Sequence, residues 1–471
     1  MSEDIRNWAW KKEEESEIEN FARGYIDFLS RCKTEREVAR WIENEAKKHG
    51  FVDISHKDRL VVGDKVYHIY NEKMVILAVI GNEELEKGIR AIFAHSDAPR
   101  LDLKPVPLEE SEEMVFLATQ YYGGIINYQW ASIPLAIHGV VITKNGQKVE
   151  LVIGESENEP VFTIPDLLPH LSGERLEKRS ASEALTGEEL KVLLANKPSK
   201  KEEKEKSESK SEEKEKLSVM ETVKKLLKEK YNIEPKDFIS ADIEIVPAFK
   251  AMEVGLDRSM IGGYGQDDRI CVFSAVKALF DLREPPTKTV VVGVLDREEI
   301  GSVGNAAAQS RLFEQFLREI IMKTRGDFNE YILGKLLENA QGISGDVNSV
   351  YDPIFTSVHD SKNSARLGKG VVITKYTGRR GKGGASEAHA EYTGWIVRLL
   401  EKAGVSWQPG TIGRVDAGGG GTVALFFANR GMNIIDIGPG LLAMHSPFEV
   451  CSKADLYATW KAYKCFLEAK E

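Results

Sequence analysis

The sequence contains few cysteines, and none lies in a pair spaced to bind a metal. Only four occur among 471 residues, with no CxxC motif: Cys32, Cys271, Cys451 and Cys465. So sparse a set argues against a disulfide framework and against a zinc site built from thiolates. We therefore expect a reducing compartment, and we expect histidines and carboxylates to hold any bound metal.

Long apolar runs and an excess of positive charge are also missing. No segment reaches the about 18 consecutive apolar residues of a membrane-spanning helix. The first residues, MSEDIRNWAWKKEEESEIE, are too charged for a secretory signal peptide. The formal net charge is −10, whereas nucleic-acid-binding domains usually carry a basic surface. We expect a cytoplasmic protein whose partners include neither a membrane nor a nucleic acid.

Helical patterns and apolar runs alternate in a way typical of an α/β fold. Thr34 with Glu37, and Ser452 with Asp455, predict helices that begin with capping boxes. Five runs are strand-like: VYHIY (66–70), MVILAVIG (74–81), IRAIFAHSD (89–97), TVVVGVLD (289–296) and NIIDIG (433–438).

The pattern changes after about residue 105 to short alternating runs with turn signals, which favours a small β-rich domain. We predict that residues 1–105 and 236–471 form one α/β domain and that residues 106–235 form a β-rich domain inserted into it. Residues 197–216 contain eight Lys, seven Glu, four Ser and one Pro. This composition predicts a flexible surface insert, or alternatively a segment that binds a partner.

Two polar motifs contain residues that could bind a metal ion. His95 ends the apolar run IRAIFA, and Asp97 shares its face because residues i and i+2 of a strand point the same way. Asp267 lies in QDDR, after the glycine-rich turn IGGYG. Each has a simpler interpretation, since His95 could be a hydrogen-bonded residue at a strand end and Asp267 could compensate a helix terminus.

Two adjacent glutamates, Glu298 and Glu299, follow the apolar run TVVVGVLD. In open α/β sheets, ligands lie at the carboxyl ends of the strands. Two such carboxylates repel each other unless a cation lies between them, although they could also be surface residues of a loop. Asp346 in GISGDV and His445 in LLAMHSPFE complete an ordered set of candidates.

Histidines and carboxylates without thiolates suit a pair of divalent ions such as zinc, with cobalt and manganese as alternatives. Two ions about 3.5–4 Å apart share a bridging carboxylate, and each lowers the pKa of bound water. A further carboxylate then moves the proton of that water. An Asp two residues from a histidine ligand can hold its imidazole in one tautomer.

The strings AHSDAPRLDLKP, YGQDDR, LDREEIGS, SGDV and AMHSPFE occur in the order found in a known family. The chain resembles the aspartyl aminopeptidase and vacuolar aminopeptidase I family of di-zinc exopeptidases over about residues 20–190 and 235–468. The variant TKYTGRRGKGGAS is similar to the prokaryotic aminopeptidase 1 branch. The resemblance implies a mixed sheet sandwiched by helices, with an inserted β-rich dimerisation domain.

The resemblance also implies a role for each candidate. Asp267 would bridge two ions and Glu298 would be the general base. His95 and Asp346 would complete one metal site, and His445 and Glu299 the other. Asp97 would be the aspartate that orients His95.

A tetrahedral dodecamer built from dimers is a further implication of the resemblance. His170, in IPDLLPHLS, would contact substrate in the active site of a neighbouring subunit, or it is an ordinary surface residue. Gly420, in the run Gly418–Gly421, could present backbone N–H groups to substrate, or it could serve a tight turn. Lys375 begins the basic loop KYTGRRGKGG, which could receive an acidic group or could simply be solvated.

We predict a metallo-aminopeptidase that removes N-terminal residues, acidic or neutral, from peptides. A deacylase or carboxypeptidase with two metal ions would use the same ligand set. A self-assembling scaffold that has lost catalysis is the third alternative, which the paired carboxylates argue against.

Overall fold

The computed structural model describes residues 7–180, 183–199 and 217–470, and the chain divides into two compact units. The first unit comprises Met1–Ala98 and Lys250–Glu471, and the second comprises Pro99–Phe249. The insert predicted at residues 106–235 lies inside the second unit. The limits of that unit lie further out because β5 (Arg100–Ser111) and β10 (Ala241–Pro247) belong to its sheet. Most of the charged segment predicted at 197–216 lies outside the described residues.

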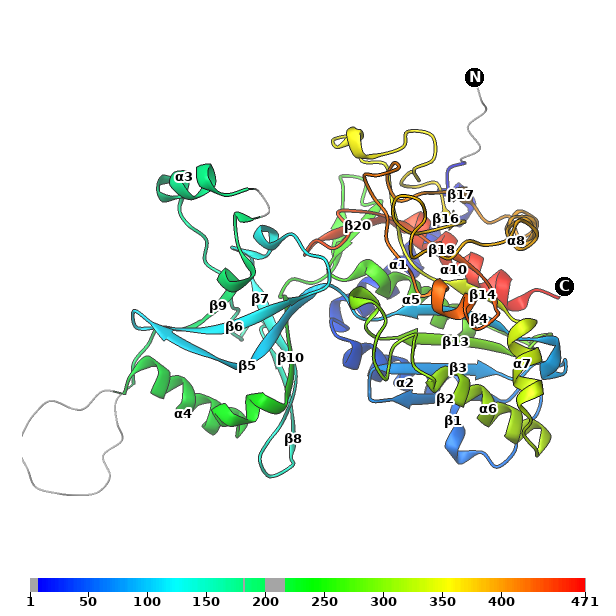
Figure 1. Ribbon diagram of the computed structural model, residues 1–471, viewed down its shortest axis with the longest axis horizontal. Helices are drawn as coiled ribbons and strands as arrows, with labels where there is room; N and C mark the ends of the chain where they lie inside the picture. Colours follow the sequence, from blue (N-terminus) through cyan, green and yellow to red (C-terminus); the bar gives the residue numbers. More distant parts are fainter. Residues whose placement is uncertain (1–6, 181–182, 200–216, 471) are drawn as a thin grey trace, which may run out of the picture. The chain divides into compact units, whose positions relative to one another are not determined.

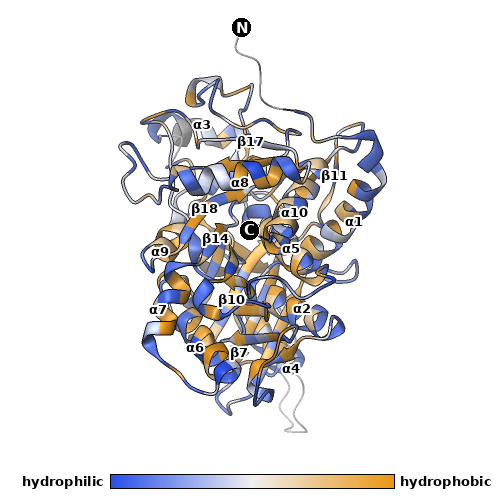
Figure 2. Ribbon diagram, turned by 90° about the vertical axis from the view of Figure 1, so that its right-hand side faces the viewer, coloured by the Kyte–Doolittle hydropathy of each residue, from blue (hydrophilic) through white to orange (hydrophobic). Residues whose placement is uncertain are grey.

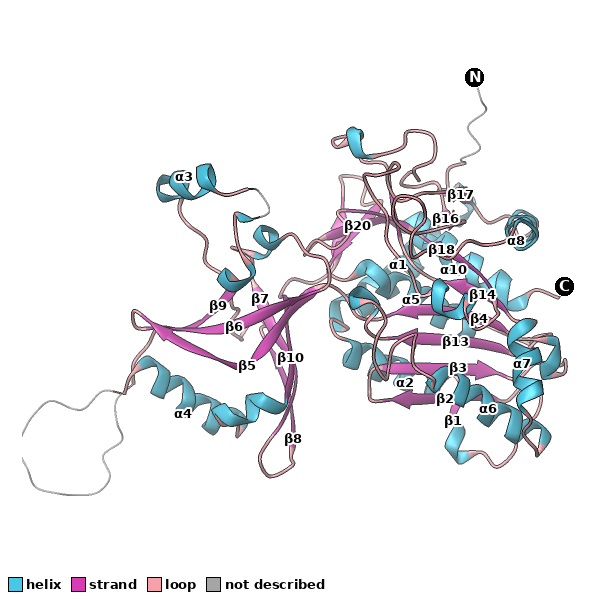
Figure 3. Cartoon of the chain, viewed as in Figure 1, coloured by secondary structure: helices cyan, strands magenta, loops and turns pink. Residues whose placement is uncertain are grey.

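A nine-stranded mixed sheet forms the centre of the first unit, in the order β1-β2-β3-β13-β4-β14-β18-β16-β17 (Figures 1 and 3). Neighbouring strands from β13 to β18 are parallel, whereas β3 and β16 run antiparallel to β13 and β18. The predicted α/β class is therefore confirmed. The strands are β1 (Val52–Asp53), β2 (Lys65–Tyr70), β3 (Met74–Val79), β13 (Val290–Leu295), β4 (Arg90–His95), β14 (Gln341–Ser344), β18 (Asn433–Gly438), β16 (Val371–Thr374) and β17 (Trp407–Pro409).

Helices cover both faces of this sheet, each over its own apolar core. Apolar and polar residues alternate around α6 and α8 (Figure 2), as expected of helices with one face on a core. Strands β3, β4 and β13 are buried throughout, which explains their continuous apolar sequences. One core contains residues of α1 (Glu15–Arg31), α2 (Glu35–Lys48), α5 (Gln266–Phe280), α8 (Ala390–Lys402) and α10 (Lys453–Glu468). The other contains residues of α6 (Leu312–Arg325), α7 (Glu330–Glu338) and α9 (Ala424–Ala428).

The two predicted capping boxes have different outcomes. Thr34 caps α2, since its hydroxyl accepts from the N–H of Glu37 and the Glu37 carboxylate accepts from the N–H of Thr34 at 3.0 Å. Ser452 precedes α10 without a side-chain cap. The prediction of a second box is wrong because the Asp455 carboxylate instead accepts hydrogen bonds from the N–H groups of the residues at 368 and 370, both at 2.7 Å.

A smaller sheet in the first unit has the order β11-β12-β20-β19-β15. It matters for function because α5 follows β12 directly and the loop of His445 joins β19 to β20. The strands are β11 (Met252–Val254), β12 (Met260–Gly263), β20 (Glu449–Ser452), β19 (Gly440–Leu442) and β15 (Asn348–Ser349).

The second unit is built on a six-stranded antiparallel sheet in the order β8-β7-β10-β5-β6-β9. Val219 and Val223 of α4 pack on Val115 of β6, so the amphipathic helix covers part of this sheet. None of the described helices, in either unit, is long and apolar enough to cross a membrane. The remaining elements are β6 (Met114–Tyr122), β7 (Leu135–Ile142), β8 (Lys148–Ile153), α3 (Pro169–Lys178), β9 (Lys191–Ala195) and α4 (Val219–Tyr231).

Candidate metal centre

Three neighbouring parallel strands bring four of the candidate residues to one edge of the sheet. His95 is the last residue of β4, Glu298 and Glu299 follow β13, and Asp346 follows β14. Because β13, β4 and β14 are parallel neighbours, their carboxyl ends open at the same edge. Strand pairing thus gathers side chains that are distant in the sequence.

Asp267 lies between two histidines. Its Oδ1 is 3.3 Å from Nε2 of His95, and its Oδ2 is 3.2 Å from Nε2 of His445. The residue stands at the start of α5, where the peptide bond between Asp267 and Asp268 is cis. Burial disfavours its charge, but the hydrogen bonds with His445 and His95 outweigh burial and lower the pKa of Asp267. One carboxylate oxygen therefore faces each histidine.

The remaining carboxylates are concentrated around this centre. Oε2 of Glu299 lies 3.4 Å from Nε2 of His445, and Oε2 of Glu298 lies 4.0 Å from Nε2 of His95. Burial raises the pKa of Glu298 to about 7, and it raises the pKa values of Glu299 and Asp346 well above their usual range. Burying so many carboxylates together is unfavourable unless positive charge compensates them.

Asp97 connects His95 to the glutamate pair. Nδ1 of His95 is 3.3 Å from Oδ1 of Asp97 and 3.0 Å from its backbone oxygen. The two carboxylate oxygens of Asp97 also accept the N–H groups of Glu298 and Glu299, both at 3.1 Å. Contacts at Nδ1 favour the tautomer protonated there, which leaves the lone pair of Nε2 facing Asp267.

Glu449 does similar work for the other half of the cluster, and sequence analysis did not identify it. Its Oε2 accepts the N–H groups of Gln266 at 2.6 Å and Asp267 at 3.2 Å, and its Oε1 accepts the N–H of His445 at 2.8 Å. The residue is buried, and burial raises its pKa to about 8. Its position four residues after His445, in AMHSPFE, was the only signal in the sequence.

The donor atoms fit a metal centre. One atom from each of His95, Asp267 and Glu299 lies within 4.8 Å of the others, and the same holds for Asp267, Asp268 and Asp346. The two sets share Asp267, and their imidazole and carboxylate donors are ligands that zinc accepts. The structure therefore brings all the predicted ligands into one cluster within the first unit.

Comparison with known proteins agrees with this geometry. Residues 28–467 match the Aminopeptidase I zinc metalloprotease family (M18). The chain belongs to this family.

Other members of the aminopeptidase I family match the chain over nearly its full length. A probable M18 family aminopeptidase 1 of Borrelia garinii subsp. bavariensis is 47% identical over 456 residues, which cover 97% of each chain. A crystal structure of an M18 family aminopeptidase from Thermotoga maritima is 42% identical with a TM-score of 0.92, covering 99% of this chain and 100% of that one. A structure of the S. cerevisiae mApe1 dodecamer is 22% identical with a TM-score of 0.73, covering 96% and 97%, and shares the fold.

Membership in the aminopeptidase I family confirms three predictions: the family, a zinc-dependent metalloprotease, and an aminopeptidase. The carboxylate of Asp97 contacts the ring of His95 and two backbone N–H groups, whereas the carboxylate of Glu449 accepts from backbone N–H groups. Such contacts leave no spacing pattern of their own, so the sequence indicated Asp97 only as a partner of His95.

The roles of the three candidate substrate residues remain predictions. The Lys375 ammonium is 3.9 Å from a carboxylate oxygen of Glu387. The carbonyl of Gly420 accepts the N–H of Gly378 at 2.7 Å. His170 is exposed on α3 of the second unit, and its predicted contact is with a neighbouring subunit.

Proposed function

We propose that this aminopeptidase holds two zinc ions, which share the carboxylate of Asp267. The observation that carries the proposal is the position of that carboxylate, whose two oxygens face His95 at 3.3 Å and His445 at 3.2 Å. His95 and Asp346 would complete one site, and His445 and Glu299 would complete the other. The ions would polarise the scissile carbonyl and acidify a bound water.

Glu298 is the general base in this proposal. Burial raises its pKa to about 7, and a carboxylate beside a metal-bound water can accept its proton and return it. Its carboxylate points toward His95, at 4.0 Å, without being one of the closest partners of Asp267. Asp97 holds the N–H of Glu298 at 3.1 Å and thereby sets the position of the base relative to His95.

The substrate would be the amino-terminal part of a peptide, with an acidic or a neutral first residue. Lys375 and the glycines around Gly420 would contact it, and His170 would reach it from a neighbouring subunit. We infer a cytoplasmic homo-oligomer, and a dodecamer is the state that the name of the related mApe1 structure suggests.

Chelation and restoration test this proposal most directly. Removing metal with a chelator should abolish hydrolysis of aminoacyl arylamides, and adding back zinc, cobalt or manganese should restore it. A panel of first residues, together with N-acyl amino acids and carboxypeptidase substrates, identifies the reaction. Activity that survives complete removal of metal, or that is confined to the N-acyl substrates, would contradict the proposal.

A further inference from the structure

The two residues that follow Asp267 in α5 contact the main chain at the end of β4. Oδ2 of Asp268 accepts the backbone N–H of His95 at 3.2 Å. Nε of Arg269 donates to the backbone carbonyl of Ser96, also at 3.2 Å. Two successive residues of the helix therefore hold two successive residues at the strand end, one by its N–H and the other by its carbonyl.

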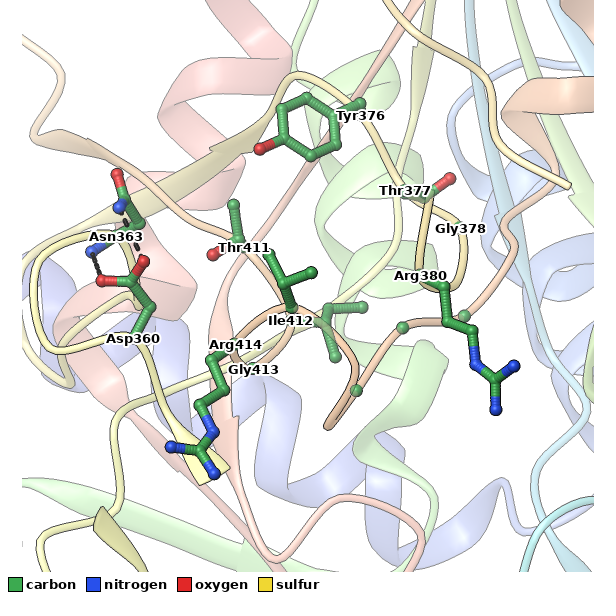
Figure 4. A pocket seen from close by; sticks show the side chains of 14 residues that line it. Asp360, Asn363, Tyr376, Thr377, Gly378, Arg380, Thr411, Ile412, Gly413 and Arg414 are labelled. Carbon is green, nitrogen blue, oxygen red and sulfur yellow. Dashed lines mark hydrogen bonds between the residues drawn. The ribbon is translucent and has the colours of Figure 1, made fainter. Parts of the chain in front are cut away.

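Arg269 differs from the arginines of the surface because its guanidinium is buried. Arg380 and Arg414, which line a pocket in the same unit (Figure 4), are exposed, whereas the relative exposure of Arg269 is 1%. No carboxylate among the described residues forms an ion pair with Arg269. Arginines are seldom fully buried without such a partner, so its hydrogen bonds to main-chain carbonyls have to compensate its burial.

The guanidinium of Arg269 joins the end of β4 to a second segment. Its Nη2 donates to the carbonyl of Lys33 at 2.7 Å, just before α2 begins. The guanidinium carbon lies 5.2 Å from the centre of the Tyr264 ring. Gly265 leaves room for the group, because a Cβ built on this glycine would overlap Nη1 of Arg269. The chain that enters α5 is thus shaped around the arginine.

Ser96 is also held from the neighbouring strand β13. Its N–H and its hydroxyl both donate to the carbonyl of Leu295, at 2.9 and 3.1 Å. Together with the contact from Arg269, these hydrogen bonds fix the main chain of Ser96 on two sides. The segment from His95 to Asp97 cannot shift without breaking them, so the imidazole of His95 has a fixed origin.

The position of His95 matters because its Nε2 lies only 3.3 Å from Oδ1 of Asp267. Distances between a metal and its ligands vary by only about 0.2 Å, and residues that orient a ligand change metal affinity by about 10- to 100-fold. We propose that Asp268 and Arg269 are positioning residues of the metal centre, which fix the main chain at His95 and thereby the imidazole that binds zinc. This inference rests on the proposed function, because it takes His95 as a zinc ligand.

The competing interpretation is that Asp268 binds the ion itself. Its Oδ1 is buried without a hydrogen-bond partner among the described residues, and one of its oxygens lies within 4.8 Å of donor atoms of Asp267 and Asp346. Asp268→Asn removes the negative charge but keeps an oxygen that can accept the N–H of His95, whereas Asp268→Ala removes both.

The two Asp268 variants separate these interpretations. We expect D268N to keep its zinc affinity within about threefold of the wild type and D268A to lose about tenfold. An equal loss of zinc affinity in both variants would identify Asp268 as a ligand and overturn its positioning role.

Arg269→Lys tests the second contact. Lysine keeps the charge but lacks the planar fork with which a guanidinium reaches two carbonyls. The matched control is Arg90→Lys, which changes another fully buried arginine at the opposite end of β4, where Nε of Arg90 donates to Oε1 of Gln341 at 3.1 Å. Arg269→Gln removes the charge as well, and His95→Ala marks the zinc site to which His95 belongs.

Zinc affinity is measured on each full-length variant by competition with a chelating dye, beside kcat, KM and the thermal midpoint of the metal-free protein. We expect R269K to bind the ion that H95A loses about tenfold more weakly than the wild type. Its kcat at saturating zinc should fall about tenfold with KM almost unchanged. R90K should bind zinc normally, although both lysine variants should lower the thermal midpoint because each removes buried hydrogen bonds.

A loss of zinc affinity confined to R269K therefore supports positioning over a general loss of stability. Wild-type zinc affinity in both R269K and R269Q, or an equal loss in R90K, would overturn the role of Arg269. So would a loss in R269Q that is absent from R269K, since charge rather than the paired hydrogen bonds would then be the cause. If neither Arg269 variant folds, the comparison of D268N with D268A decides whether His95 is positioned in this way. Zinc binding that H95A leaves unchanged would instead contradict the proposed function.

Discussion

Two buried carboxylates, Asp97 and Glu449, hold the backbone and side chains of the candidate metal ligands in place. Asp97 accepts the N–H groups of Glu298 and Glu299 at 3.1 Å and lies 3.3 Å from Nδ1 of His95. Glu449 accepts the N–H groups of Asp267 and His445. Each buried carboxylate therefore orients candidate ligands that come from two different elements.

Glu298→Gln tests the assignment of the base. Glutamine keeps the shape of the side chain but cannot accept the proton of water, so kcat should fall at least about a hundredfold. Zinc content and oligomeric state should remain normal, because the proposed ligands are unchanged. Near-normal turnover with full zinc content would remove Glu298 from the mechanism.

Glu449→Gln tests a positioning role. The amide replaces one of the two accepting oxygens, so the N–H of His445 or those of Gln266 and Asp267 lose their acceptor. We expect zinc affinity, activity or both to fall by about 10- to 100-fold, as for other residues that orient metal ligands. Zinc competition with a chelating dye, read beside kcat and KM, measures this loss. Wild-type zinc affinity together with wild-type kinetics would show that these contacts of Glu449 are dispensable.

At the scale of elements, strand ends and helix starts deliver the reactive groups. The predicted runs at 66–70, 74–81, 89–97 and 289–296 correspond to β2, β3, β4 and β13 within a few residues, since apolar runs report burial directly. The helix start at Asp455 was harder to interpret. Its side chain holds the loop before β16 rather than capping α10, and the local sequence is the same in both cases.

Asp436 in the middle of β18 should make stability depend on pH. Burial raises its pKa from 3.8 to about 6 against the opposing effect of Ser344 and Thr422. Folding therefore favours the protonated form, and that stabilisation is complete below about pH 4 and is lost as the pH rises through about 6. Asp436→Asn should resemble the wild type near pH 4 and exceed its free energy of unfolding by about 3 kcal/mol at pH 8.

Guanidinium unfolding at both pH values measures this difference. Asp257→Asn is a control of opposite sign, because hydrogen bonds from Ser259 lower the pKa of Asp257 and stabilise its charged form. That control should lose stability relative to the wild type at pH 8 and approach it at low pH. A stability difference for Asp436→Asn that is the same at pH 4 and pH 8 would contradict the assignment.

At the scale of the whole molecule, the second unit is continuous in the sequence while the first is not. Residues Pro99–Phe249 form their own antiparallel sheet, and in the sequence they separate the two segments that build the first unit. The family resemblance implies that this unit mediates dimerisation, and the proposed function has His170 of this unit reach the active site of a neighbouring subunit.

Mixed assemblies test whether His170 acts across subunits. Glu298→Gln chains have an intact His170, and His170→Ala chains have an intact base, so both pure proteins should have low activity and full zinc content. Co-expression in equal amounts should recover about a quarter of wild-type activity, because random mixing pairs an intact base with a neighbouring intact His170 at about that frequency.

Light scattering measures the size of the mixed assembly, and peptide hydrolysis measures its activity. If the mixture is no more active than the average of the two pure variants, His170 does not act from a neighbouring subunit. Unchanged kinetics of pure His170→Ala would remove its substrate role altogether.

The sequence by itself determined the elements and the chemical type of the centre. Apolar runs marked the strands, and His95, Glu298, Glu299 and Asp346 stood just at or beyond their ends, with no thiolate available. Burial and the period of a strand are local properties, so they can be recognised in one segment at a time.

Only the tertiary structure decided that these groups converge. The strand order β13-β4-β14-β18 pairs segments that are far apart in the chain, and it brings His95 and His445 to opposite oxygens of Asp267. Glu449 became visible in the same way. Its partners come from distant segments, and no local pattern of residues encodes such contacts.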